Sequence, residues 1–418
     1  MNKLEAIIYN LVKTNPRIKN KLRNIYQLAM AVVPVKKVST NYQITTREGF
    51  FFGFHDKTPF SYDDSKLLAH RYRGDDRRTP DTDDQVDIGY FEGADYLQFK
   101  PLHRSTAWNW NQGAMLQWIG ETDHLIFNDF DGKRHVAKIS DCAGSLLETL
   151  DLPIGAVSPD GTKALSYDFA RLRRGMPGYG YSNGSDPDYG VNIPGREGSG
   201  LKLIELKNSE VRELFTLADI AALEPEESMQ GAFHYFTHCL FNPSGGRFAF
   251  FHRWLVDDNL RFTRLITCDM QGKDIYIFPT AGMVSHYAWK DDQHVLAYAS
   301  TRADGDRYYL FEDQGSGLEV VGRDCFNSDG HPQFSPEGNY FVTDTYPDRF
   351  RRQALIIFDW QAGRRRDLAR MQLPLRFIRE PRCDFHPRWN RQGDMICFDS
   401  AHTGNRSLCT VSLSNSDH

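Results

Sequence analysis

Four histidines occupy the same position in a pattern that recurs through the second half of the chain. Each stands three residues before an aromatic residue, and a turn rich in Pro, Gly, Asp or Asn follows before a short apolar strand. They are His238, His286, His331 and His386. Side-chain direction alternates along a strand, so an equal register predicts an equal direction. If the repeats are related by rotation, the four imidazoles converge on the axis, where they could bind a divalent metal ion such as zinc or manganese.

Cysteines near these histidines bear on the choice of metal. Cys239 lies beside one histidine and Cys383 three residues before another, and a thiolate ligand would favour zinc. The alternative is that the histidines serve the fold alone, through hydrogen bonds to the neighbouring repeat.

Polar residues follow the apolar strands of the first four repeats, near the points where loops begin. They include the pairs His70-Arg71 and His252-Arg253, and a nearby segment, 103–112, is rich in Trp, Asn, His and Arg. Arginine forks bind carboxylates through two hydrogen bonds, and aromatic faces pack on sugar rings. We therefore expect a cleft for an acidic sugar, with a polar rim of weak surface ion pairs as the alternative. The expected substrate-binding residues are His70, Arg71, Trp108, Trp110, Gln112, Arg174, His252 and Arg253.

The chemistry that fits these residue types is β-elimination from a uronic acid. The reaction needs a neutralised carboxylate, a base for the C5 proton and an acid for the leaving oxygen. The chain has no Gly-x-Ser-x-Gly nucleophile motif, P-loop or dinucleotide fingerprint. Candidate catalytic residues are His103, Asn109, Asn128, Tyr167, Arg171, Tyr179 and Tyr181. Two alternatives stay open: a glycoside hydrolase that uses aspartates near strand ends, and a non-catalytic propeller that binds glycan or assembly partners.

The elements that must position these residues are blades of a propeller. The aromatic-turn-strand unit also occurs three times without the histidine, at intervals that suit one four-stranded blade each. Its seven anchors are Phe60, Trp118, Val157, Phe241, Trp289, Phe334 and Trp389. Long amphipathic helices are nearly absent after residue 35, which argues against α/β architectures. We expect an all-β, seven-bladed propeller over residues 47–418, with one long, Arg- and Tyr-rich loop between Tyr167 and His238 that is a candidate functional segment.

The N-terminal segment, residues 1–46, has a different composition. It is basic and carries two apolar stripes at helical spacing. We expect a helical extension that packs on the propeller or, through residues 1–37, contacts a membrane surface or an assembly partner. No signal peptide is evident, and the seven cysteines form no disulfide framework. A cytoplasmic protein, free or membrane-associated, is therefore expected, and the net charge of −5 argues against nucleic acid as a partner.

Three motifs carry a resemblance to a known family. They are Phe-His-Asp-Lys-Thr-Pro-Phe-Ser (54–61), Trp-Asn-Gln-Gly-Ala-Met-Leu-Gln-Trp (110–118) and His-Pro-Gln-Phe-Ser-Pro-Glu-Gly (331–338). Over most of residues 47–412 the chain resembles the propeller polysaccharide lyases, the oligogalacturonate-lyase and ulvan-lyase group. The resemblance implies β-elimination of a uronate-containing polysaccharide, a metal site at the four repeated histidines, and an active site around Tyr167 and Arg171, with Arg174, Tyr179 and Tyr181.

The chain departs from the ulvan-type enzymes in two respects. They are secreted, whereas no signal peptide is evident here, and no histidine stands near Gln112. These differences turn the expectation from degradation of marine polysaccharide towards a bacterial protein that acts on an acidic capsular polysaccharide or exopolysaccharide.

Overall fold

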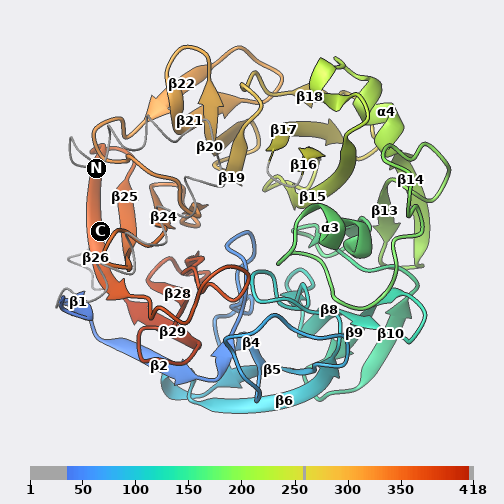
Figure 1. Cartoon of the computed structure of the whole chain (residues 1–418). Coiled ribbons are helices and arrows are strands. Elements are labelled where there is room, and N and C mark those ends of the chain that lie inside the picture. Colours follow the sequence, from blue (N-terminus) through green and yellow to red (C-terminus); the bar gives the residue numbers. More distant parts are fainter. Residues whose placement is uncertain (1–34, 258–259, 414–418) are drawn as a thin grey trace.

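The computed structural model describes residues 35–257 and 260–413, whose strands form seven antiparallel sheets around a central axis (Figure 1). The predicted seven-bladed β-propeller is confirmed. Within each blade the strands follow one another outward from the axis, as Figure 1 shows for β19 to β22.

The first four blades are built from strands that are consecutive in the chain. Blade 1 holds β3 (Phe50–Phe51), β4 (Leu67–Arg71), β5 (Val86–Glu92) and β6 (Gln98–Ser105). Blade 2 holds β7 (Gln117–Trp118), β8 (His124–Phe130), β9 (His135–Asp141) and β10 (Leu146–Leu150). Blade 3 holds β11 (Ala156–Val157), β12 (Lys163–Ser166), β13 (Leu201–Glu205) and β14 (Glu210–Phe215). Blade 4 holds β15 (Phe233–Phe241), β16 (Arg247–Asp257), β17 (Leu260–Asp269) and β18 (Tyr276–Ile277).

Blade 5 also uses consecutive strands, β19 (Val284–Trp289), β20 (His294–Thr301), β21 (Gly305–Glu312) and β22 (Leu318–Val321).

Blades 6 and 7 take their outermost strands from the N-terminal part of the chain. Blade 6 holds β23 (Gln333–Phe334), β24 (Tyr340–Asp344), β25 (Arg352–Asp359), β26 (Arg364–Gln372) and β1 (Val38–Thr40). Blade 7 holds β27 (Arg388–Trp389), β28 (Met395–Ser400), β29 (Ser407–Ser412) and β2 (Ile44–Glu48).

The ring is closed by pairing between the two ends of the propeller. Strand β2 runs antiparallel to β29, from Ile44 opposite Val411 to Glu48 opposite Ser407, and so covers an edge that would otherwise be open. Residues 38–48 are therefore propeller strands and overlap the segment 1–46 that we expected to be helical. Residues 1–34 lie outside the described residues.

The helices of the described residues are few and short. They are η1 (Ala94–Tyr96), α3 (Phe169–Gly175), α4 (Leu217–Ala222) and η2 (Glu227–Met229). None of the described helices combines the length and the apolar character that a membrane span requires.

The repeated aromatic anchor joins neighbouring blades. The indole N–H of Trp118 in blade 2 donates to the Pro59 carbonyl at 2.9 Å, which ties blade 2 to blade 1. Trp289 donates to the Leu240 carbonyl of blade 4 at 3.2 Å. Trp389 makes the same contact with blade 6. The pattern recurs because each tryptophan fills the space between two sheets and satisfies its one polar atom there.

The turn after the anchor is also a repeated structure. In blade 3 the Ser158 hydroxyl accepts a hydrogen bond from the backbone N–H of Lys163, and in blade 4 the Asn242 side chain accepts one from Arg247. The intervening Gly161 has φ +70°, which a residue with a Cβ rarely adopts. The Ser/Asn-to-Gly spacing seen in the sequence is thus what a tight turn between the first two strands of a blade requires.

Candidate metal centre and surrounding pocket

The four repeated histidines surround one aromatic ring at the axis. The connection between β3 and β4 projects into the centre of the ring and carries Phe54 (Figure 1). The Phe54 ring centroid lies 4.8 Å from that of His238, 5.9 Å from His286, 5.9 Å from His331 and 5.0 Å from His386. Rotation about the axis therefore brings equal register positions of blades 4 to 7 to one place.

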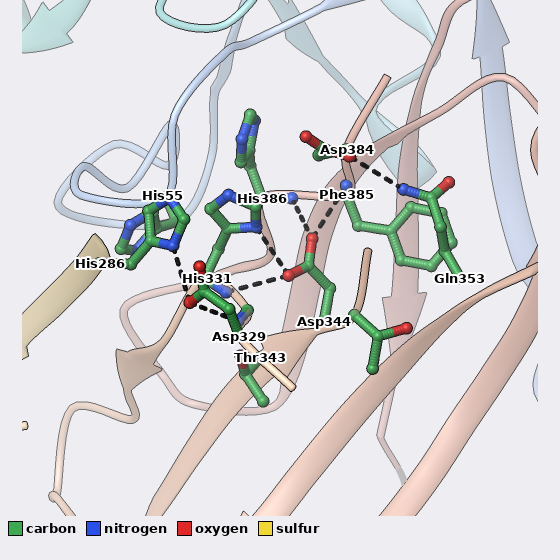
Figure 2. A network of polar contacts seen from close by, with 12 residues as sticks. His55, His286, Asp329, His331, Thr343, Asp344, Gln353, Asp384, Phe385 and His386 are labelled. Carbon is green, nitrogen blue, oxygen red and sulfur yellow. Dashed lines mark hydrogen bonds and ion pairs between the residues drawn. The ribbon is translucent and has the colours of Figure 1, made fainter. Parts of the chain in front are cut away.

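A fifth histidine joins this group from blade 1. His55 lies near His331 (Figure 2), with the two ring centroids 5.4 Å apart. Nδ1 of His55 is 2.8 Å from the Pro332 carbonyl. A carbonyl can only accept, so Nδ1 carries the proton and Nε2 keeps its lone pair. The sequence pattern did not select His55, because it lies outside the repeated register.

Two carboxylates, the buried Asp344 and the partly buried Asp329, orient two of the histidines. Asp344 Oδ1 lies 2.7 Å from Nδ1 of His331, and Asp329 Oδ1 lies 3.0 Å from Nδ1 of His286 (Figure 2). Such a carboxylate fixes the tautomer and leaves Nε2 as the free electron-pair donor, as it does behind metal-bound histidines. Burial alone would lower the pKa of His331, but the carboxylates of Asp344, Asp384 and Asp329 together raise it.

Several imidazole nitrogens of this group have no partner. Nε2 of His55, His238, His331 and His386 is buried and makes no hydrogen bond. Buried polar atoms in folded proteins almost always have a partner, so four such atoms around one axis indicate a missing ligand.

An acidic residue completes a group that could hold a cation. His331, Asp384 and His386 each offer one ligand atom, all within 4.8 Å of one another. Arg382 donates hydrogen bonds to the Asp384 carboxylate from Nε at 2.9 Å and from Nη2 at 2.6 Å. Burial alone would raise the pKa of Asp384, but Arg382 holds it below its usual value. Two imidazoles and one carboxylate are a donor set that suits Mn²⁺ or Zn²⁺, so the residues present fit a divalent metal ion.

The cysteines named as alternative ligands take no part in this group. Cys383 packs in an apolar cluster with Leu373, Phe377 and Ala401. Burial raises the pKa of Cys383 to about 12, so its thiolate is disfavoured. Asp384, the next residue, lies with the histidines instead.

The backbone around the histidines is unusual. His238 has φ +57° and His386 φ +44°, both in the left-handed region that residues with a Cβ seldom adopt. Strand pairing shifts register between Thr237 and Leu240, and again between Val284 and Tyr287. Bulges of this kind re-aim side chains, and such backbone strain is concentrated at functional sites.

A buried arginine lies beside the histidines without a carboxylate partner. Arg253 is 4% exposed, and Nη1 contacts the Met176 sulfur at 2.9 Å, whereas Nε has no hydrogen bond. Burial lowers the pKa of Arg253, and the nearby hydroxyl of Tyr235 is also without a partner. A guanidinium that is buried and unpaired among the described residues is suited to bind the carboxylate of a ligand.

A short segment, residues 176–182, covers the histidines, and we call it the cap. Its Tyr179 ring lies 5.3 Å from that of His238 and 6.0 Å from Phe54. Asn111 donates to the Gly178 carbonyl at 2.8 Å and Asn109 to the Gly180 carbonyl at 3.2 Å.

The cap leaves little room at the axis. Arg173, just before it in α3, forms a 2.8 Å ion pair with Glu380 of the connection between blades 6 and 7. The cavity beside His238 and His286 has a volume of about 10 Å³. That is space for about one water molecule, so this cavity does not hold a sugar ring in the structure as described.

Two of the predicted site residues, His70 and Asn128, make contacts that join neighbouring blades. The His70 ring accepts the Ala114 N–H at 3.0 Å, and Asn128 makes two hydrogen bonds with the backbone of Ile154. Each residue ends the second strand of its blade and holds the loop that leads into the next blade. Asp344 holds the backbone of Phe385 and His386 in the same way, and Asp399 that of Phe52 and Gly53.

The other predicted residues of blades 1 to 4 are also engaged in the fold. Arg71 pairs with Asp87, His103 of β6 contacts Ser140 of β9 in blade 2, and His252 contacts His234. The indoles of Trp108 and Trp110 donate to backbone carbonyls. Gln112 is the exception, because its buried side-chain amide has no hydrogen-bond partner among the described residues. A role of these residues in substrate binding remains a prediction.

The long connection between β12 and β13 contains the remaining candidates. Arg171 pairs with Asp186 at 3.3 Å and donates to three backbone carbonyls, and Arg174 pairs with the same aspartate. Tyr181 accepts a hydrogen bond from Asn128, whereas the buried Tyr167 hydroxyl has no partner. Of this set, Tyr179 is the residue that the structure brings against a histidine of the group.

Comparison with known proteins supports the architecture. No protein-family profile matches the chain, and no curated protein matches it in sequence. An oligogalacturonate lyase solved in complex with manganese is similar in structure, with a TM-score of 0.64 and 15% identity over 91% of this chain and 96% of that one. The oligogalacturonate lyase from Vibrio parahaemolyticus has a TM-score of 0.61 and 12% identity, over 91% and 99% of the two chains. At this identity the likeness establishes the shared propeller fold.

Proposed function

We propose that this protein is a metal-dependent lyase that cleaves a uronate-containing acidic glycan, of the bacterial capsular or exopolysaccharide class, by β-elimination. The observation that carries the proposal is the set of unpartnered Nε2 atoms at the axis, two of which belong to the His331, Asp384 and His386 group. A cation at that group and the buried guanidinium of Arg253 near His238 would supply the two positive groups that a uronate carboxylate needs. The likeness to manganese-bound oligogalacturonate lyase points in the same direction.

The residues of the site divide into holding and reacting groups. His331, Asp384 and His386 would hold the ion, which when bound withdraws charge from the substrate carboxylate and so acidifies the C5–H bond. Arg253 binds the same carboxylate and orients the ring.

Proton transfer falls to the residues around the cap. Nδ1 of His238 lies 2.8 Å from the Thr237 hydroxyl, which can accept or donate, so Nε2 can take up the C5 proton. Burial raises the pKa of Tyr179 to about 12, which keeps its phenol protonated and able to protonate the leaving oxygen. The C4–O bond breaks as the C4–C5 double bond forms.

The test is the appearance of the unsaturated product. Purified protein with Mn²⁺ or Zn²⁺ is incubated with a panel of uronate polymers and oligomers, and the ultraviolet absorbance of the unsaturated uronate is recorded. Asp384→Asn should abolish the signal, whereas His124→Ala, at an exposed histidine of blade 2, should leave it unchanged. A panel without any product, or full activity in Asp384→Asn, contradicts the proposal.

A non-catalytic glycan-binding propeller is the second candidate, and the small volume of the cavity beside His238 and His286 favours it. It predicts glycan binding without bond cleavage in the same panel. A hydrolase that uses aspartates near strand ends is disfavoured. Two such aspartates, Asp344 and Asp399, already accept hydrogen bonds from backbone N–H groups.

Location in the cell is a further proposal. We propose a cytoplasmic protein that contacts the membrane or an assembly partner through residues 1–37. Fractionation of cells that express the full chain and a chain without these residues tests both parts.

A further inference from the structure

A second pocket lies on the long connection between β12 and β13, apart from the histidines. Its volume is about 350 Å³, and it lies between the β8–β9 turn of blade 2 and residues 184–200 of blade 3. It shares no lining residue with the cavity beside His238 and His286. Pockets that bind small ligands begin at about 300 Å³, so this one can accept a single sugar residue.

Two partly buried side chains of opposite charge, Lys202 and Asp168, line this pocket without forming an ion pair with each other. Lys202 Nζ donates to the Gly198 carbonyl at 2.7 Å, and Asp168 accepts a hydrogen bond from the Arg171 backbone N–H at 2.7 Å. Among the described residues, neither side chain has an ion-pair partner within 4.0 Å. Burial lowers the pKa of Lys202 and raises that of Asp168, so each charge lacks the solvation that a polar ligand would restore.

The rim adds positive charge. Lys133 is exposed and makes no ion pair with a described residue, whereas the neighbouring Arg134 is paired with Asp151 at 2.7 Å. The lysines of the pocket therefore outnumber its unpaired carboxylates. Positive charge at the rim and one carboxylate within favour a ligand that has both a carboxylate and hydroxyl groups.

The walls of the pocket are fixed by close backbone contacts. A Cβ on Gly184 would lie 2.8 Å from the His135 ring, and one on Gly200 would lie 1.9 Å from the Phe215 carbonyl oxygen. His135 in turn contacts the Asn183 side chain at 3.0 Å. The pocket is thus a formed feature of the propeller.

We propose that this pocket binds an acidic sugar residue, with Lys202 and Lys133 on its carboxylate and Asp168 accepting from its hydroxyl groups. The site is separate from the metal centre, and its binding requires neither metal nor turnover. The inference does not depend on the proposed lyase activity.

Calorimetric titration of metal-free protein with glucuronate and galacturonate, against glucose and galactose, tests the proposal. Uronate should bind more tightly than neutral sugar, and Lys202→Met should weaken uronate binding by about tenfold, the effect of losing one charge-assisted hydrogen bond. Lys163→Met, at the opposite end of the same strand pair, is the matched control and should bind normally. Thermal unfolding of each variant reports on folding, and Asp168→Asn provides a second variant if Lys202→Met is unstable.

Three outcomes overturn the proposal. They are no uronate binding by the wild-type protein, unchanged binding in both Lys202→Met and Asp168→Asn, and loss of binding in His386→Ala, which would place the sugar at the axis.

Discussion

Asp344 should control both the stability of the ring and the affinity for metal. Its Oδ1 accepts the His331 backbone N–H at 2.9 Å and lies 2.7 Å from His331 Nδ1, and its Oδ2 accepts the N–H groups of Phe385 and His386 at 3.0 and 3.1 Å. The side chain is 2% exposed. One buried carboxylate therefore links blades 6 and 7 and orients a proposed metal ligand.

The size of the effect follows from these four contacts. Asp344→Asn removes the charge and puts an amide donor where one oxygen accepted, so at least one buried N–H loses its partner, at about 1–3 kcal/mol for each group. Loss of the charge from four charge-assisted contacts brings the expected destabilisation to about 3–5 kcal/mol. Loss of the residue that orients a metal-bound histidine lowers metal affinity by about 10- to 100-fold.

Two measurements separate these effects. Urea denaturation of metal-free protein gives the free energy of unfolding, and calorimetric titration with Mn²⁺ gives the affinity under conditions in which the protein is folded. Asn128→Ala is the matched control, because Asn128 joins blades 2 and 3 in the same way but contacts no histidine of the metal group. If Asp344→Asn kept its metal affinity, or Asn128→Ala lowered affinity equally, the assignment of Asp344 would be refuted.

Three further predictions test the proton donor, the pH dependence and the closure of the ring. Tyr179→Phe keeps the ring over His238 but removes the phenol, so the elimination rate should fall by about 100-fold with unchanged stability; an unchanged rate would exclude Tyr179 as the acid. Burial lowers the pKa of His70 to about 3, below its unfolded value, so His70 adds to stability above about pH 6.5, and this contribution is lost as the pH falls. His70→Gln should therefore flatten the decline in unfolding free energy between pH 6 and 4, by about 1.4 kcal/mol per pH unit, and an unchanged slope would contradict this. Deletion of residues 1–48 removes β2 and should abolish cooperative unfolding, whereas deletion of residues 1–34 leaves β2 in place and should not; equal behaviour of the two truncations would show that β2 is dispensable.

The repeat in the sequence was sufficient to predict the blades and to bring the histidines together. His331 and His386 occupy equal register positions, and rotation converts equal register into a shared axis. Asp344 could not be assigned in this way, because its partners Phe385 and His386 are 41 and 42 residues away in another blade. The sequence around Asp344 does not indicate which backbone N–H groups of the next blade its carboxylate will accept hydrogen bonds from.

The polar residues near the ends of the second strands make a contact that the sequence did not reveal. His70 and Asn128 are polar residues at positions where a propeller often binds ligand, and the sequence therefore favoured a cleft. In the structure they satisfy backbone groups of the next blade, a requirement that becomes visible when the loops are in place. Polarity at a strand end indicates that a partner exists, but not whether the partner is backbone or ligand.

The pairing of β2 with β29 sets the order in which the protein can mature during synthesis. Arg47 in β2 donates to the Thr410 hydroxyl, 363 residues further along the chain. The ring therefore cannot close on the ribosome until the last strand has emerged, and contacts this distant in sequence form slowly. His386 lies in the same late part of the propeller, so a chain that stops before residue 386 would lack a residue of the proposed metal centre.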